Sequence, residues 1–258
     1  MLVDSHCHLE YDGLVDDQPG VLARARAAGV GAFLNISTKR SEWDRVVATA
    51  EREHDVFASV GIHPHHADDH QDVDEDDLAA AAAHPKVIGL GETGLDYYYE
   101  RSDREAQQRL FRRHIAVARD SRLPVIIHTR DADDDTAKIL AEEMMKGDFP
   151  ALIHCFTASA AFGERVLDLG LSISISGIAT FKNASELADF AAKVPEDRLL
   201  VETDSPFLAP VPHRGKPCEP AFVADTARFL AERRGITPEA LAEATTANFY
   251  RLFTKAAA

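Results

Sequence analysis

Two histidines near the N-terminus are the first residues whose type and spacing suggest chemistry. They occur in the segment Leu2-Val3-Asp4-Ser5-His6-Cys7-His8-Leu9. If this segment is a β-strand, its side chains alternate between two faces, and His6 and His8 lie beside each other on the face that also carries Asp4. Two imidazoles directed at one point commonly bind a first-row divalent metal, and Asp4 could orient one of the rings. His-x-His pairs also occur at solvated strand ends, so a metal site requires further ligands from elsewhere in the chain.

Further histidines and carboxylates follow apolar segments at intervals along the chain. A single histidine at such a position usually has a structural role. Several strands that each deliver a histidine or a carboxylate are different, because four histidines and two carboxylates provide enough ligands for two divalent ions with a shared carboxylate. The segments are Gly61-Ile62-His63-Pro64-His65, Gly91-Glu92-Thr93-Gly94-Leu95-Asp96, Ile127-His128-Thr129-Arg130, Ile153-His154-Cys155-Phe156 and Glu202-Thr203-Asp204-Ser205-Pro206.

The predicted elements would bring these residues to one end of a single domain. Apolar strands and amphipathic helices alternate along the chain, and continuous apolar runs are typical of parallel sheets. Strands are predicted at residues 2–9, 31–37, 56–62, 87–95, 125–129, 151–156, 172–178 and 199–203, and helices at 19–30, 41–54, 74–83, 103–121, 132–145, 160–169, 185–192 and, split near Gly235, within 220–253. This pattern predicts the α/β class and a (β/α)₈ TIM barrel that forms one domain over residues 1–258, with 254–258 as a frayed tail. Active sites of such barrels lie at the C-terminal ends of the strands, where all these polar residues fall.

The composition limits the kind of protein and its partners. The 258 residues are 45% hydrophobic and 28% charged, which is typical of a globular protein. No apolar run is long enough to span a membrane, and Cys7, Cys155 and Cys218 are too few and too scattered for a disulfide framework, so we expect a cytoplasmic protein. The net charge of −15 argues against a broad electrostatic interface with nucleic acid, but a few Lys and Arg side chains near a metal site would suffice to bind phosphates. Nothing in the sequence indicates a protein partner.

Taken together, these segments resemble the signature segments of the TatD family of metal-dependent deoxyribonucleases. The resemblance rests on Asp-Ser-His-Cys-His-Leu, Gly-Ile-His-Pro-His, Gly-Glu-Thr-Gly-Leu-Asp-Tyr, Ile-His-Thr-Arg, Ile-His-Cys-Phe and Glu-Thr-Asp-Ser-Pro, which occur in the order and spacing of that family. With Ala-Asn-Phe-Tyr-Arg-Leu-Phe at residues 247–253, it covers nearly the whole chain. It implies hydrolysis of phosphodiester bonds in DNA, with trimming of single-stranded ends and activity supported by two Mg²⁺ or Mn²⁺ ions. Zn²⁺ is the alternative, because imidazole-rich sites suit it better than they suit Mg²⁺.

The resemblance also implies a role for each polar residue. His6, His8 and Asp204 would bind one metal, His128 and His154 would bind the second, and Glu92 would bridge the two ions. Asp204 would also act as the general base, because it would lie beside the bound water and could take its proton. Glu202 lies two residues earlier on the same strand, so we expect it to support the ligands from behind.

Substrate contacts are predicted from position and from the same resemblance. The residues are His63, His65, Asp96, Tyr97, Arg130, Arg214 and Lys216. Tyr97 could stack on a base, and the segment His213-Arg214-Gly215-Lys216 follows the last strand, where barrels often bind phosphate. Arg214 and Lys216 could equally well be ordinary exposed charges of the loop that do not contact the substrate. Cys218 departs from the family, which commonly has Asn there, and so lacks an amide donor and acceptor.

Two other functions are compatible with the same ligands. An amidohydrolase-type barrel could use a metal pair to hydrolyse a small-molecule amide, ester or lactone. Many such enzymes bridge their metals with a carboxylated lysine, but here Glu92 has that position and Lys86 lies at the far end of the strand. A barrel that binds metal or nucleic acid without catalysis is the third possibility, although open coordination positions argue against it.

Overall fold

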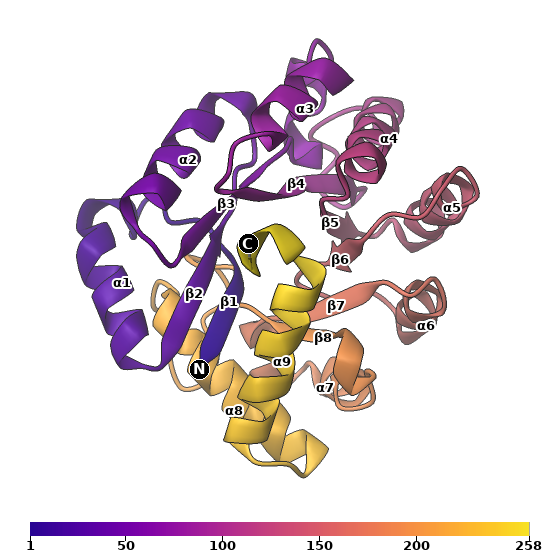
Figure 1. Ribbon diagram of the computed structural model, residues 1–258. Coiled ribbons are helices and arrows are strands. Elements are labelled where there is room, and N and C mark those ends of the chain that lie inside the picture. The colour runs from indigo at the N-terminus through magenta and orange to yellow at the C-terminus, as the bar shows by residue number, and fades with distance from the viewer. Residues whose placement is uncertain (258) are drawn as a thin grey trace.

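The computed structural model describes residues 1–257, in which eight parallel strands form one sheet in sequence order. The strands are β1 (Leu2–Cys7), β2 (Val30–Asn35), β3 (Val56–Val60), β4 (Val87–Asp96), β5 (Val125–Arg130), β6 (Ala151–Ile153), β7 (Ser172–Ile175) and β8 (Leu199–Val201). Cys7 at the end of β1 forms a parallel bridge with Ser205, just beyond β8, so the sheet curls until its two edges meet. The predicted (β/α)₈ barrel is confirmed (Figure 1).

Nine α-helices surround or close the barrel in residues 1–257 (Figure 1). They are α1 (Gln18–Ala27), α2 (Trp43–Arg52), α3 (Glu75–Ala82), α4 (Arg104–Ser121), α5 (Asp133–Met144), α6 (Ala160–Asp168), α7 (Ser185–Ala191), α8 (Val223–Arg234) and α9 (Pro238–Leu252). The boundary between α8 and α9 follows the predicted signals. Gly235 ends α8 with a φ of 67°, and the Thr237 side chain accepts the Ala240 N–H at the start of α9. None of these helices is long and apolar enough to cross a membrane.

The last three strands are shorter than predicted, because the chain turns away from the sheet just before the polar residues. β6 ends at Ile153, and Cys155 has a φ of 43°. β8 ends at Val201, and Asp204 has a φ of 58°. β7 ends at Ile175 and is followed by a short 3₁₀ helix, Gly177–Thr180. His154 and Asp204 therefore lie on the turns that leave their strands, whereas His6, Glu92 and His128 lie within theirs.

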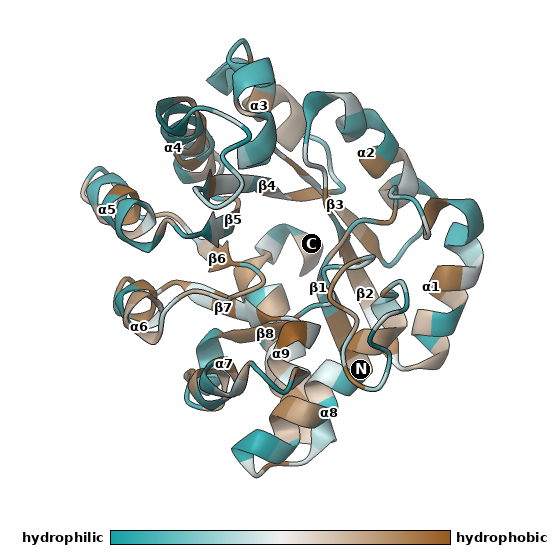
Figure 2. Ribbon diagram, turned by 180° about the vertical axis from the view of Figure 1, so that it is seen from behind, coloured by the Kyte–Doolittle hydropathy of each residue, from teal (hydrophilic) through white to brown (hydrophobic). Residues whose placement is uncertain are grey.

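The core has two layers. The larger layer packs between the strands and the surrounding helices, whose outer faces are hydrophilic in Figure 2. The smaller layer lies inside the barrel and combines one or more buried side chains from β1, β2, β4, β5, β6 and β8 with Phe249 and Phe253. Ile126 and Leu152 belong to this inner layer. His128 follows Ile126 by two residues on the same face of β5, and His154 follows Leu152 by two residues, directly after the end of β6. The inner apolar layer thus lies directly beneath the polar residues.

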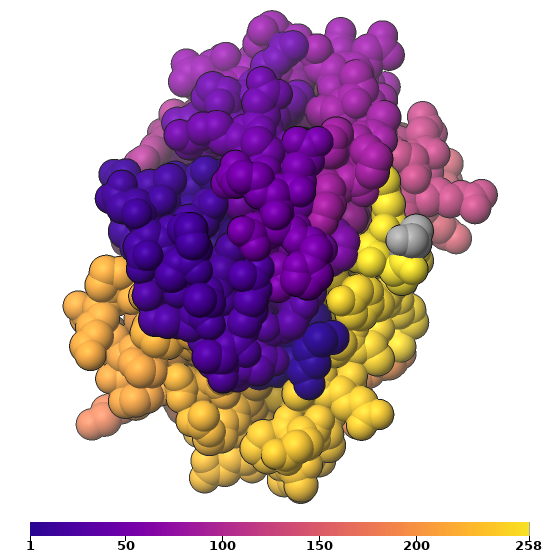
Figure 3. All heavy atoms as spheres, turned by 60° about the vertical axis from the view of Figure 1, so that its left-hand side comes forward, coloured from indigo at the N-terminus to yellow at the C-terminus, as the bar shows by residue number. Residues whose placement is uncertain are grey.

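Helix α9 closes the barrel at the N-terminal ends of the strands. It crosses that opening in Figure 1, and Thr246 on α9 donates a hydrogen bond to the Met1 carbonyl at 3.0 Å. Figure 3 shows the corresponding contact at the surface between the N-terminal residues, in indigo, and the C-terminal residues, in yellow. The barrel is therefore open for ligands only at the end where the strands finish.

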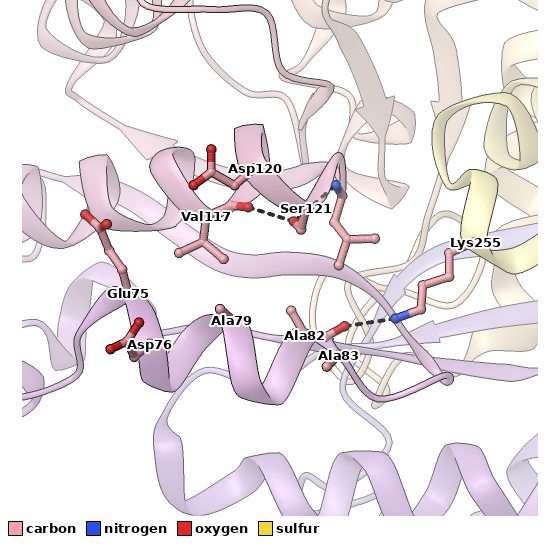
Figure 4. Close-up of a pocket in the computed structure, with 10 residues that line it drawn as sticks. Glu75, Asp76, Ala79, Ala82, Ala83, Val117, Asp120, Ser121 and Lys255 are labelled. Atoms are coloured by element: carbon pink, nitrogen blue, oxygen red, sulfur yellow. Dashed lines mark hydrogen bonds between the residues drawn. The ribbon is translucent and has the colours of Figure 1, made fainter.

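The segment expected to fray forms a short 3₁₀ helix, Thr254–Ala257. Lys255 Nζ donates to the carbonyls of Ala82 and His84, both at 2.8 Å, and so ties this segment to the end of α3. The segment borders a pocket of about 540 Å³ between α3 and α4 (Figure 4). Ala83 and Leu123 line this pocket and precede β4 and β5, so it opens at the end of the barrel opposite the polar residues. Ala258 lies outside the described residues.

A buried histidine of α4 supports the loop that carries His63. His114 is fully buried, its Nε2 accepts the Ile62 N–H at 3.2 Å, and its Nδ1 donates to the Leu110 carbonyl at 2.8 Å. Burial lowers the pKa of His114 to about 4, against 6.5 for an unfolded histidine. Between these two values the unfolded chain binds a proton that the folded chain does not bind, so stability falls as the pH falls through this window.

We therefore expect the acid sensitivity of the fold to decrease in His114→Gln, whose amide can still accept the Ile62 N–H. Between about pH 7.5 and about pH 5, the wild type should lose about 2 kcal/mol more free energy of unfolding than the variant loses. Urea unfolding at several pH values measures both slopes, and the other titrating groups affect both proteins alike. Parallel pH dependences would contradict the assignment to His114.

Candidate metal centre

A first group of donor atoms lies at the C-terminal ends of β1, β4 and β8. The Nε2 atoms of His6 and His8 are 3.3 Å apart. Glu92 Oε2 lies 3.5 Å from His6 Nε2 and 3.9 Å from His8 Nε2. Asp204 Oδ1 lies 3.7 Å from His6 Nε2 and 3.4 Å from His8 Nε2. A tetrahedral ion with bonds of about 2.1 Å separates its ligand atoms by about 3.4 Å, so these four atoms are spaced to surround one ion.

The second group faces the other oxygen of Glu92. Glu92 Oε1 lies 2.7 Å from His154 Nε2 and 3.2 Å from His128 Nδ1. His63 Nε2 lies 3.4 Å from the same oxygen. The two oxygens of one carboxylate therefore face two separate groups of ring nitrogens, which is the geometry of a carboxylate that bridges two metal ions.

Glycines allow Glu92 to reach this position between the strands. Gly91 has a φ of 146°, and a Cβ atom there would lie 2.5 Å from the Ile126 carbonyl oxygen. A Cβ atom on Gly61 would lie 2.4 Å from Gly91 Cα. Both contacts are impossible for a residue with a side chain, so β3, β4 and β5 approach this closely only because glycine is present. The Glu92 N–H then donates to the Ser37 carbonyl at 3.1 Å.

Hydrogen bonds on the outer side of three histidines direct their inner nitrogens toward the two carboxylates. A neutral imidazole carries one N–H, and the acceptor that this N–H faces fixes which nitrogen keeps the lone pair. The outer contacts run from His8 Nδ1 to the Ile36 carbonyl at 3.3 Å, from His128 Nε2 to Asp96 Oδ2 at 3.0 Å and from His154 Nδ1 to Glu202 Oε1 at 3.3 Å. Burial lowers the pKa of His8, His128 and His154, but the surrounding carboxylates outweigh it and raise each pKa above its usual value. The same inner nitrogens, once deprotonated, would be ligands for a cation between the carboxylates. The donor set therefore fits divalent metal ions.

His63 differs from these histidines in its protonation. Its Nδ1 accepts the His65 N–H at 3.0 Å, so Nε2 carries the proton and faces the centre as a donor. Burial lowers the pKa of His63 to about 3, which keeps the ring neutral. His63 is therefore placed to donate a hydrogen bond to Glu92 or to a bound substrate, and not to bind a metal.

Both carboxylates of the centre are ionised. Burial raises the pKa of Glu92, but the charge of His154 and hydrogen bonds from His128 and His154 outweigh it, and the pKa lies well below its usual value. The pKa of Asp204 is likewise lowered, because the hydrogen bond with His8 and the nearby histidine charges outweigh its burial. Anionic oxygens are what a divalent ion requires.

From the strand alternation we expected Asp4 to orient a histidine ring, but in the structure it contacts none. Its side chain accepts the N–H and the hydroxyl of Thr203, at 2.8 and 2.6 Å, and burial raises its pKa to about 8. Thr203 directly precedes Asp204, so Asp4 fixes the turn that carries this carboxylate. Glu202 supports the centre from behind, as expected, through its contact with His154 and a hydrogen bond from the Ser174 hydroxyl.

A pocket of about 780 Å³ opens above the two groups of donor atoms. Three of the predicted substrate residues line it, namely His63, His65 and Arg130. The residues to which we assigned no substrate contact but which also line it include Tyr11, Tyr99, Arg101 and Phe207. The sequence contained a signal for the last three, because each lies within five positions after Asp96 or Asp204 on a loop that leaves a strand.

The other predicted substrate residues do not line this pocket. The Tyr97 hydroxyl bonds with Asp135 at 2.8 Å and Gln108 at 2.8 Å. The Arg214 guanidinium stacks 3.9 Å from the centroid of the Phe181 ring. Lys216 lies in the same loop as Arg214, outside the pocket lining. Cys218, where the family commonly has Asn, is fully buried, and its N–H donates to the Pro206 carbonyl at 3.0 Å. This difference from the family therefore affects the packing of the loop.

Asp96 is buried and positions two histidines instead of facing the substrate. Its Oδ2 lies 2.9 Å from His65 Nε2 and 3.0 Å from His128 Nε2, and its Oδ1 accepts the N–H groups of Tyr98 and Tyr99 at 3.1 and 2.9 Å. Burial raises its pKa, but the hydrogen bonds from His128, His65 and Tyr99 outweigh this effect and hold it far below its usual value. Asp96 thus connects the second donor group to the loop that carries the tyrosines.

We expect Asp96→Asn to weaken metal binding about 10- to 100-fold, because an amide has a single acceptor oxygen. That oxygen can serve either the two histidines or the N–H groups of Tyr98 and Tyr99, so the ring of His128 loses its fixed orientation. Competition with a chromogenic chelator measures the affinity. Asp135→Asn is a matched control, since this carboxylate accepts from the Tyr97 hydroxyl and Gln108 and touches no histidine of the centre. Unchanged affinity in Asp96→Asn would show that His128 does not depend on this contact.

Comparison with known proteins identifies the family. A family model described as TatD related DNase matches residues 3–254. The metal-dependent hydrolase YcfH of Escherichia coli is 48% identical over 255 residues, which cover 98% of this chain and 95% of YcfH. The metal-dependent hydrolase TatD of Mycobacterium tuberculosis is 36% identical over 259 residues, which cover 98% of this chain and 97% of that protein.

Solved structures agree with the sequence comparison. The crystal structure of the TatD homologue YjjV from Escherichia coli superposes with a TM-score of 0.92 at 32% identity, and the match covers 98% of each chain. The organophosphorus hydrolase from Deinococcus radiodurans, with a TM-score of 0.63 at 18% identity, shares the fold. Family model, sequence identity and structure all extend over the residues that form the centre, and the chain belongs to the TatD family of metal-dependent hydrolases.

Proposed function

We propose that this hydrolase cleaves phosphodiester bonds in DNA with two divalent metal ions and trims single-stranded ends. The observation that carries the proposal is the Glu92 carboxylate, whose two oxygens face two separate groups of ligand atoms. His6, His8 and Asp204 would hold one ion, and His128 and His154 would hold the other. Two arginines, Arg101 and Arg130, line the pocket above them and supply positive charge for phosphate oxygens.

The residues around the centre have distinct roles in this reaction. Metal ions bound here would activate water and stabilise the charge that develops on the phosphoryl group. Asp204 lies at the pocket with its side chain 15% exposed, so it can accept the proton of the attacking water. The Nε2–H of the neutral His63 donates a hydrogen bond to an oxygen of the phosphoryl group.

The surroundings of Glu92 and Lys86 support a nuclease over a lysine-bridged amidohydrolase. Lys86 lies before β4 and donates to the carbonyls of Glu53, His54 and Val56, all at 3.1 Å. It is therefore tied to the opposite end of the barrel from the centre.

The three cysteines are free thiols, which supports our expectation of a reducing, cytoplasmic location.

Metal removal and restoration test the function. The metal-stripped protein should release no nucleotide from a labelled single-stranded oligonucleotide, and Mg²⁺ or Mn²⁺ should restore release, with Zn²⁺ as the third ion tested. Duplex DNA, RNA and a panel of small amides, esters and lactones define the substrate. Hydrolysis of a small molecule, with no release from DNA under any metal, would replace the nuclease by the amidohydrolase-type reaction.

A further inference from the structure

Three exposed aromatic side chains gather at the open end of the barrel. Tyr98, Phe207 and Tyr99 are 56%, 50% and 47% exposed, which makes them the most exposed aromatic residues in the described chain 1–257. They lie on the loops that leave β4 and β8. Exposed aromatic surface that collects at one place marks a site that a ligand or partner covers. Here that place is the mouth of the pocket above the metal centre.

The aromatic residues form two walls, one on each side of the centre. β4 and β8 are four strands apart in a barrel of eight, so they face each other across it. Tyr99 lines the pocket and lies 5.3 Å from the His65 ring. Phe207 also lines the pocket and lies 6.3 Å from the ring of His8 and 6.2 Å from that of Tyr11. A ligand held at the centre therefore has an aromatic surface on either side.

The two walls differ in charge. The guanidinium of Arg130 lies 4.2 Å from the centroid of the Tyr98 ring and 4.8 Å from that of Tyr99, and Arg101 lies 5.5 Å from Tyr99. Arg101 and Arg130 are the only arginines or lysines among the pocket-lining residues of the described chain, and both belong to the Tyr99 wall. The Phe207 wall offers an aromatic face without a cation.

From this asymmetry we propose that the two walls bind the two nucleosides joined by the scissile phosphodiester. The terminal base stacks on Phe207, the next base stacks on Tyr99, and the following phosphate binds Arg101 and Arg130. This inference rests on the proposed nuclease function. Aromatic side chains stack on any base, and arginines pair with backbone phosphates, so both walls suit single-stranded DNA of any sequence.

The direction of the strand follows from where its charges lie. An end nucleotide has no phosphate beyond the one being cleaved, so it needs no cation on its outer side. The rest of the strand carries one phosphate per nucleotide and is stabilised where Lys or Arg side chains are present. The strand therefore enters over the Tyr99 wall, and the nucleotide to be released lies on the Phe207 wall.

The test combines protein variants with oligonucleotides that lack one base. Wild type with its metal first shows at which end of a single-stranded oligonucleotide the nucleotide is released. The base of the terminal nucleotide, or of the second nucleotide from that end, is then removed. Phe207→Ala should lower kcat/KM about tenfold on the intact substrate and cause no further loss when the terminal base is absent. Tyr99→Ala should likewise lower kcat/KM on the intact substrate and cause no further loss when the second base is absent.

Control variants separate stacking from a general disturbance of the mouth. Tyr99→Phe keeps the ring, so its kcat/KM should again fall when the second base is removed, unlike that of Tyr99→Ala. Val211→Ala removes a side chain that is 48% exposed on the same loop as Phe207 but lies outside the pocket lining, and it should match wild type on all substrates.

Other results would overturn the inference. Equal losses on intact and base-lacking substrates would show that neither ring stacks on a base, although the nuclease would stand. If Phe207→Ala were insensitive to loss of the second base, and Tyr99→Ala to loss of the terminal base, the strand would run in the opposite direction. No release from DNA by wild type under any metal would refute the nuclease function, and with it the two walls.

Discussion

Replacing Glu92 by glutamine is expected to lower kcat by at least about a thousandfold and to reduce the bound metal. Glutamine keeps the size of the side chain, but one of its terminal atoms becomes an NH₂ group, which cannot bind a metal ion. Glu92 Oε1 lies 2.7 Å from His154 Nε2, and Oε2 lies 3.5 Å from His6 Nε2, so whichever oxygen is replaced, one donor group loses its shared anionic ligand. Nucleotide release from single-stranded DNA and elemental analysis of the purified protein measure both effects.

A second variant controls for the change of Glu to Gln itself. Glu105 lies on α4 with its side chain 86% exposed, so Glu105→Gln makes the same substitution where no metal binds, and it should retain activity and metal. Thermal unfolding of the metal-free proteins establishes that the barrel of Glu92→Gln remains folded. Full activity of folded Glu92→Gln would exclude a bridging role for this carboxylate.

Asp204→Asn is expected to lower kcat about a thousandfold while the KM for DNA changes little. Asparagine can still offer an oxygen to the first metal, but it cannot accept a proton from the attacking water. The backbone of Asp204 has a φ of 58°, and asparagine adopts this left-handed conformation more readily than most residues, so the variant should fold. Steady-state kinetics with metal at saturation separate kcat from KM.

Asp131 provides the matched control for this substitution. It also has a positive φ, of 52°, and it lies exposed at the rim of the same pocket. Asp131→Asn repeats the chemical change in a similar backbone conformation, and we expect it to retain activity. Undiminished kcat in Asp204→Asn would move the general base to another group.

The barrel and the candidate ligands could be predicted from the sequence because both depend on regular spacing. Apolar strands alternate with amphipathic helices, and each strand delivers its side chains to the inside at every second residue. Ile126 and Leu152 are inner-core residues, and His128 on β5 and His154 directly beyond β6 each lie two residues after one of them. The structure brings all six predicted ligands together at one end of the barrel. That they bind metal remains a prediction.

Residues beyond the strand ends could not be predicted in this way, because the direction of a side chain there depends on the turn of the backbone. Asp96 was expected to meet the substrate, but it is buried beneath His65 and His128. Tyr97 was expected to stack on a base, whereas Tyr99, two residues later, lines the pocket. The register of β1 with β2 is also irregular between Asp4 and Cys7, so the alternation counted from Asp4 does not hold, and Asp4 contacts Thr203 and not a histidine ring.

The closure of the barrel by α9 has a consequence for how the protein is made. His6 and His8 are synthesised first and Asp204 late, and the inner core beneath them is complete only with Phe249 and Phe253. The ribosome therefore releases most of the barrel before the residues that complete it exist. The inner core beneath the candidate ligands is therefore incomplete until the last helix has emerged, and we expect a growing chain to lack hydrolase activity until then.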